Sequence, residues 1–290
     1  MKTPLLGLTL FFLLGFALPA PAQPPSPVIS ITPYIYFGPD TVAKIKLESS
    51  LPSLVDYNYF YRGTHPWFFE DSTLDSLHDV WNILDVACCN YVVDSSDVIG
   101  DTLNNFCYFV RAVDTDCHPD STMWSFSLPS NVVCDFDYPL YPGWNLVSMP
   151  VTRANGDRSA RDLLPGAQSP IWGYSAATVS YLPAESLAAG RGYWALSTTA
   201  SVAQFYGQPS YDVVCTLLVG WNLISGAFLR GHGGGVPAES LWIVPPGAVD
   251  LASIYRYDAS LHSYAHADTL QAGRGYFILS SSGAILRFRR

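Results

Sequence analysis

Short segments in which apolar and polar residues alternate dominate the first half of the chain. This period-two alternation is typical of half-buried β-strands, and it predicts strands at 28–31, 42–47, 57–61, 90–93, 106–113 and 124–128. Turn signals rich in Gly, Pro and Asp separate the segments, as at 38–40 and 99–101. A series of short strands joined by turns predicts an all-β sandwich in this part of the chain.

The N-terminus follows a different pattern, in which Lys2 precedes an apolar run at 5–18 and small residues at 19–22. This order of charged, apolar and small residues is typical of a secretory signal peptide, so we predict a signal peptide at 1–22 with cleavage before Gln23. Asp, Gly and Pro interrupt the later apolar stretches, which therefore fall short of the roughly 20 residues that a membrane-spanning helix needs. We expect a secreted, cell-surface or periplasmic protein that does not span the membrane after cleavage.

Composition supports the β class and narrows the range of partners. Aromatic residues make up 14% of the 290 residues, and Gly and Pro number 22 each, which favours strands and turns over long helices. The formal net charge of −9 comes from scattered acidic residues and disfavours nucleic acid as a partner. The six cysteines lack zinc-ligand spacing and predict disulfides in an exported chain, in which either one cysteine stays free or Cys215 pairs across a domain boundary.

Three segments in the N-terminal half carry a family resemblance: 57–63 (YNYFYRG), 106–114 (FCYFVRAVD) and 129–133 (PSNVV). In this order they resemble the third, sixth and seventh strands of a bacterial fibronectin type III domain. The chain departs from the family pattern at Leu47, where the family usually keeps Trp, and at Phe106, where a corner Tyr is expected. The resemblance implies an immunoglobulin-like sandwich over about 26–137.

An internal duplication follows. GWNLVS at 143–148 recurs as GWNLIS at 220–225, and 171–197 aligns without gaps to 254–280. This part resembles the Gly-Trp-Asn-Leu repeats of bacterial secreted and cell-surface proteins, which implies a non-catalytic surface or spacer role. We expect a fibronectin type III-like domain at 23–137, a first small β-rich repeat at 138–212 and a second at 213–290.

The duplicated positions predict a core for each repeat. Alternation along the first motif places Trp144 and Leu146 on one side of a strand, so we expect Trp144 and its equivalent Trp221 to pack inside their own repeats. The two Gly-Arg-Gly segments precede aromatic strands instead of helices, which favours tight turns with positive φ over phosphate-binding loops. The remaining expected core residues are Gly190, Gly192, Tyr193, Gly273, Gly275 and Tyr276.

Candidate catalytic and metal-binding patterns lack their required partners. The His232-Gly-Gly-Gly segment resembles the oxyanion loop of esterases, but no nucleophile elbow follows it. His262 and His266 are spaced for one face of a helix, yet they fall in an expected hairpin, and no carboxylate pair is singled out. We therefore predict no catalytic residue, no cofactor and no metal ligand.

These observations favour a non-catalytic secreted or cell-surface adhesion or scaffolding protein that binds another surface protein or a glycan. The first alternative is a carbohydrate-binding protein that uses exposed aromatic residues, because such β-domains can stack sugars without any catalytic group. Trp67 and Phe69 are the candidate binding residues, although they can also cover one end of the sandwich. A secreted hydrolase is the second alternative.

Overall fold

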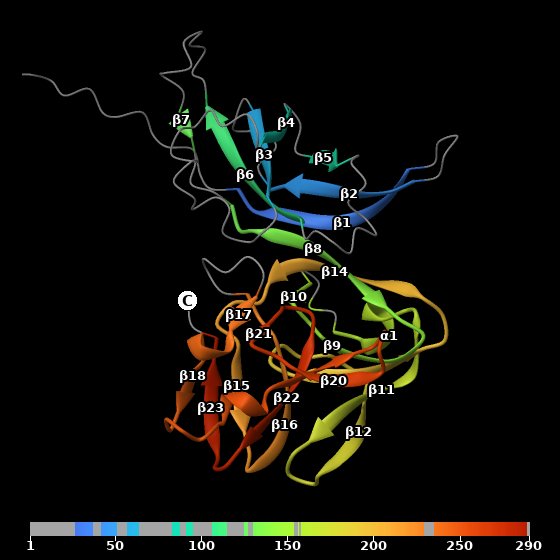
Figure 1. Ribbon diagram of the computed structural model, residues 1–290. Helices are drawn as coiled ribbons and strands as arrows, with labels where there is room; N and C mark the ends of the chain where they lie inside the picture. The colour runs from blue at the N-terminus through green and yellow to red at the C-terminus, as the bar shows by residue number, and fades with distance from the viewer. Residues whose placement is uncertain are drawn as a thin grey trace, which may run out of the picture.

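The computed structural model describes residues 27–36, 42–50, 57–63, 83–87, 91–94, 106–114, 125–126, 130–153, 156, 158–228 and 235–288. Nearly all regular structure in these ranges is antiparallel β-sheet (Figure 1), which confirms the all-β prediction. No helix in the described part of the chain is long and apolar enough to cross a membrane. The expected signal peptide at 1–22 and the candidate residues Trp67 and Phe69 lie outside the described residues.

The N-terminal half contains two sheets, drawn in blue and green at the top of Figure 1. All six strands expected from the alternation are present, within a few residues of their predicted limits, and β4 is an additional strand. One sheet contains β1 (Ile29–Tyr36), β2 (Val42–Ser49) and β5 (Tyr91–Asp94); the other contains β3 (Tyr57–Gly63), β4 (Ile83–Ala87), β6 (Phe106–Asp114) and β7 (Ser125–Phe126).

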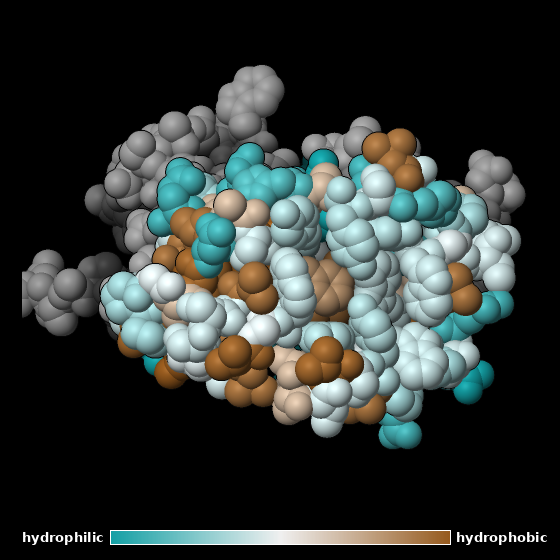
Figure 2. Space-filling view, turned by 60° about the horizontal axis from the view of Figure 1, so that its bottom comes forward, coloured by the Kyte–Doolittle hydropathy of each residue, from teal (hydrophilic) through white to brown (hydrophobic). Residues whose placement is uncertain are grey.

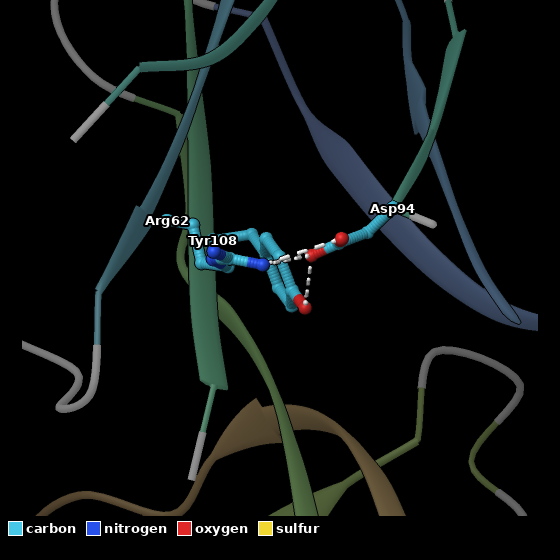
Figure 3. A network of polar contacts seen from close by, with 3 residues as sticks. All are labelled: Arg62, Asp94 and Tyr108. Carbon is cyan, nitrogen blue, oxygen red and sulfur yellow. Dashed lines mark hydrogen bonds and ion pairs between the residues drawn. The ribbon is translucent and has the colours of Figure 1, made fainter. Parts of the chain in front are cut away.

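A buried polar network joins these two sheets (Figure 3). Asp94 on β5 is 1% exposed and accepts hydrogen bonds from Arg62 Nη1 on β3, at 3.0 Å, and from Tyr108 Oη on β6, at 3.1 Å. Burial and the Asp94 charge raise the pKa of Tyr108, so its hydroxyl stays protonated and can donate. The network fixes the sheets relative to each other at a position where an unpaired carboxylate would be costly.

Strand β8 (Val133–Leu140) belongs to both halves of the chain. It pairs with β6 through Cys107 and Cys134, which form a disulfide, and along its length with β14 of the first repeat. The result is a seven-stranded sheet with the path β10-β14-β8-β6-β3-β4, in which β7 pairs with β6 beside this path. The expected boundary between 137 and 138 therefore falls inside a strand, which pairs with β14 on both sides of that point.

The two repeats have the same strand order. The first runs β12-β11-β13-β9 and the second β20-β19-β22-β16. The first repeat contains β9 (Gly143–Ser148), β10 (Val151–Thr152), α1 (Ala160–Leu163), β11 (Ala167–Ser175), β12 (Ser180–Ala184), β13 (Gly192–Ser197) and β14 (Ser201–Pro209). The second contains β15 (Val214–Leu217), β16 (Gly220–Ser225), β17 (Val236–Pro237), η4 (Ala238–Ser240), β18 (Trp242–Val244), η5 (Leu251–Ser253), β19 (Tyr255–Asp258), β20 (Ser263–His266), β21 (Thr269–Leu270), β22 (Gly275–Ser280) and β23 (Ala284–Arg287).

Equivalent backbone contacts tie the repeats to each other. Val147 forms an antiparallel bridge with Arg274, and the equivalent pair, Ile224 and Arg191, forms the same bridge in the opposite direction. Between the bridges lies an apolar cluster to which each repeat contributes two residues: Leu146, Trp194, Leu223 and Phe277. The two repeats thus pack as a pseudo-symmetric pair with a shared interior.

Candidate functional site

The Asn of each Gly-Trp-Asn-Leu motif fixes a tight turn. Asn145 Oδ1 accepts from the Tyr141 amide at 2.9 Å, and its Nδ2 donates to the Tyr141 carbonyl at 2.8 Å. Asn222 makes the same pair of bonds with Leu218, at 2.9 and 2.7 Å. Because these side chains replace missing backbone partners, both copies form the same turn directly before the strand that carries the Trp.

The Gly-Arg-Gly turns have the predicted geometry. Gly190 and Gly273 adopt φ values of 85° and 84°, which confirms the prediction of positive φ. The next aromatic residue closes each turn, since Tyr193 Oη accepts from the Ala188 amide at 2.9 Å and Tyr276 Oη accepts from Gln271 at 2.7 Å. Tyr193 and Tyr276 are both buried, in agreement with the expectation that they belong to the repeat cores.

Gly192 and Gly275 lie where the repeats approach most closely. A Cβ atom on Gly192 would lie 2.9 Å from the carbonyl oxygen of Ile224, and one on Gly275 would lie 2.8 Å from Leu146 Cγ. These two glycines therefore serve the contact between repeats, in addition to the fold of each one.

The expected burial of Trp144 and Trp221 is wrong. Their side chains are 40% and 41% exposed. Trp144 does share a strand face with Leu146, as the alternation predicts, but this face meets the other repeat, and Val147 on the opposite face fills the repeat's own core. Trp144 consequently lies at the interface between the repeats, while the Trp221 ring contacts Tyr255 and Phe277 of its own repeat.

A cavity of about 490 Å³ opens at this interface. Figure 2 views the molecule from the end that carries the β11–β12 hairpin, where side chains of intermediate hydropathy gather beside apolar ones. The lining consists of three Trp and three Tyr: Trp144, Trp172, Tyr181 and Trp194 from the first repeat, and Tyr257 and Tyr264 from the second. We call this cavity the aromatic pocket.

The rings of the aromatic pocket are arranged around Trp194. This indole is 8% exposed, and the rings of Trp144, Tyr257 and Tyr264 meet it at 82°, 74° and 88°. Centroid distances from Trp194 are 6.2, 4.8 and 6.4 Å, within the range of edge-to-face aromatic contact. Trp194 thus forms a base from which the other rings rise at nearly right angles.

The polar groups of the aromatic pocket are uncharged. Burial raises the pKa of Tyr264, and the neighbouring phenols of Tyr181 and Tyr257 raise it further, so its hydroxyl stays protonated. The hydroxyls and the indole N–H groups can donate hydrogen bonds, and the hydroxyls can also accept them. The pocket therefore offers apolar ring surfaces together with neutral hydrogen-bonding groups.

A smaller cavity of about 150 Å³ adjoins the aromatic pocket and shares Tyr257 with it. We call it the polar cavity, because its lining includes Asn145, Arg256, Asp258 and Arg274. The Arg274 guanidinium lies 5.4 Å from the centroid of the Tyr138 ring, which also lines this cavity. Tyr257 is thus the residue that the linings of the aromatic pocket and the polar cavity have in common.

Sequence reasoning missed most of this site. It placed Trp144 in a core and did not single out Trp194. The alignment of Tyr174 with Tyr257 and of Tyr181 with Tyr264 could have indicated the aromatic hairpins, because aromatic residues repeat there in both copies. Nothing in the sequence indicated that the hairpins of different repeats meet at one pocket.

Of the other sequence candidates, His232 lies outside the described residues, whereas His262 and His266 lie within them. His262 is at the β19–β20 turn and His266 is on β20, 3.1 Å from Asp268. Within the described ranges, no three His, Cys, Asp or Glu side chains are grouped to hold a metal ion. Cys215 is a free thiol, and burial raises its pKa to about 12, so it is protonated and unreactive at neutral pH.

Compared with known protein families, with curated proteins and with solved structures, the chain finds no match.

Proposed function

We propose that the chain is a non-catalytic carbohydrate-binding protein of the exported, adhesive type, and that the aromatic pocket is its binding site. The observation that carries this proposal is the lining of three indole and three phenol rings around one cavity. Pockets that bind small ligands combine apolar walls with a few polar groups, and this pocket has both.

Sugars suit this chemistry because a pyranose ring has apolar C–H faces and a rim of hydroxyl groups. The C–H faces can pack on Trp and Tyr rings, while the hydroxyls exchange hydrogen bonds with phenols and indole N–H groups. The net charge of −9 disfavours nucleic acid, whose bases also stack on aromatic rings but whose phosphates would be repelled.

The rest of the chain supports an adhesive role. The expected signal peptide would export the protein, and the N-terminal sandwich, which resembles a fibronectin type III module, would hold the repeats away from an attachment point. The disulfide between Cys107 and Cys134 fastens this sandwich to the strand that leads into the repeats, as suits a chain under load outside the cell.

A glycan array tests the proposal. Residues 23–290 should bind a defined set of glycans, and Trp144→Ala should abolish binding, because it removes an exposed ring from the pocket. Trp242→Ala is the matched control, since Trp242 is 36% exposed and lies outside the pocket lining. Trp242→Ala should bind as the wild type does.

Equal loss of binding in both variants, or none in Trp144→Ala, would refute the aromatic pocket as the site. Absence of glycan binding, with specific capture of one surface protein instead, would favour the scaffolding alternative.

A further inference from the structure

Two arginines and one carboxylate line the polar cavity beside the aromatic pocket. Asp258 Oδ1 already accepts hydrogen bonds from Ser260 Oγ at 2.6 Å, the Ser260 amide at 3.0 Å and the Leu261 amide at 3.1 Å. These bonds, led by that from the Ser260 hydroxyl, lower the pKa of Asp258 and keep the carboxylate ionised. One carboxylate oxygen is therefore engaged in shaping the hairpin turn.

The polar cavity carries excess positive charge. Arg256 and Arg274 supply two positive charges against the single negative charge of Asp258. This local excess contrasts with the formal charge of −9 for the whole chain. A positive site on an acidic protein favours a small anion or an anionic group of a larger ligand, since an extended polyanion would be repelled by the surrounding surface.

The duplication separates residues that serve the fold from residues that only one repeat has. Arg274 is equivalent to Arg191, and each arginine forms one of the two equivalent bridges between the repeats, so its position is part of the shared architecture. Arg256, by contrast, is equivalent to Gly173 in the first repeat. Since the first repeat forms the same strand order without this guanidinium, the fold does not require Arg256.

The same comparison distinguishes the aromatic pocket. Trp172 and Trp194 in the first repeat are equivalent to Tyr255 and Phe277 in the second. The largest rings therefore occur in one copy, and the added guanidinium occurs in the other, yet both line adjoining cavities. Departures from the repeat pattern converge on one place in the molecule, which is what a binding site built onto a duplicated scaffold requires.

From these observations we propose that the site binds an acidic saccharide. Its sugar ring would lie in the aromatic pocket, and its carboxylate or sulfate group would enter the polar cavity and pair with Arg256 and Arg274. The planar guanidinium group binds such oxyanions in a bidentate manner, and Arg274 is already oriented by the Tyr138 ring. This inference rests on the proposed function and adds to it the charge of the ligand.

The experiment compares matched pairs of glycans that differ only at one position. An array would present neutral oligosaccharides beside the same oligosaccharides with a 6-carboxylate, as in uronic acids, and with a 6-sulfate. We expect residues 23–290 to bind an anionic member of a pair at least about tenfold more tightly than the neutral member, since a charge-assisted hydrogen bond contributes enough for one decade in affinity. Calorimetry on the best pair would then give the dissociation constants.

Two variants separate the charge from the stacking surface. Arg256→Gln should weaken binding of the anionic glycan about tenfold and leave the neutral glycan unchanged, because it removes charge and keeps most of the side-chain length. Trp144→Ala should abolish binding of both. Arg287→Gln is the control, because its guanidinium lies 5.5 Å from the Trp242 ring, outside both cavities.

The outcomes distinguish the inference from the proposed function. Preference for the uronic acid or for the sulfate identifies which oxyanion the arginines take, and either supports the inference. Equal affinity for neutral and anionic members overturns the inference and leaves the carbohydrate-binding function standing. An effect of Arg256→Gln that equals that of Arg287→Gln also overturns it, and binding to no glycan overturns both.

Discussion

The contact between the two repeats depends on glycines that lie against backbone, and substituting them tests the pseudo-symmetric packing. In Gly192→Ala the new methyl group would lie 2.9 Å from the Ile224 carbonyl oxygen and 2.9 Å from Leu223 Cγ. The carbonyl cannot move freely, because Ile224 is bridged to Arg191. In Gly275→Ala the methyl group would lie 2.8 Å from Leu146 Cγ and 3.2 Å from the Val147 carbonyl oxygen.

Overpacking by one methyl group in a close-packed region costs about 1–3 kcal/mol. We therefore expect each variant to lower the melting temperature by about 2–12 °C, given the shift of roughly 2–4 °C per kcal/mol for a domain of this size. Gly173→Ala is the matched control. Its methyl group would meet nothing closer than 3.7 Å, and the change removes a glycine from a strand, so stability should stay the same or rise slightly.

Thermal and urea unfolding of the three variants, followed by tryptophan fluorescence, measure these differences. The fluorescence of Trp194, at the repeat interface, makes the assay sensitive to the contact in question. Gly192→Ala and Gly275→Ala variants that melt together with Gly173→Ala would refute the close approach of the two repeats at these positions.

Two further predictions concern the N-terminal sandwich and its junction. Asp94→Ala should destabilise the protein by about 3 kcal/mol, which is at the low end for a broken buried ion pair. The low value is expected because the Arg62 side chain is 33% exposed and can reach solvent. A loss of stability below about 1 kcal/mol in urea unfolding would contradict this prediction. Burial, and then the charge of Asp137, raises the pKa of Asp135 above its ordinary value of 3.8, so the folded state favours the protonated form. The stability that the wild type gains from the protonated Asp135 is fully present below pH 3.8 and is lost as pH rises through the raised pKa. Asp135→Asn should therefore gain stability relative to the wild type between pH 4 and neutral pH. A stability difference that does not change with pH would contradict this prediction.

Several features of the molecule follow from local sequence. Period-two alternation located six strands of the N-terminal half, since a strand that buries one face must alternate. The Gly-Arg-Gly turns were predictable because glycine adopts positive φ at little cost and an aromatic strand follows directly. The strand order that the two repeats share agrees with their duplication, because equivalent sequences form equivalent local structure.

The alternation of apolar and polar residues did not identify which part of the protein packs against each face of a strand. Strand β9 is buried on both sides beyond Trp144, so alternation separates Trp144 and Leu146 from Val147 but cannot tell which face meets the repeat's own core. Strand β8 likewise contains the expected domain boundary, yet its backbone pairs with β6 of the N-terminal half and with β14 of the first repeat. Hydrogen bonds between distant strands leave no local signature in the chain.

The candidate site depended most on tertiary structure. The sequence determined that the chain is all-β, duplicated and rich in aromatic residues, because these properties arise from composition and from short-range pattern. Only the packing of one repeat against the other decided that Trp194 would lie beneath Tyr257 and Tyr264 and that Arg256 would face the adjoining cavity. A pocket between repeats is formed by side chains far apart in sequence, so its position is set by the crossing of two sheets and by the glycines that let them approach.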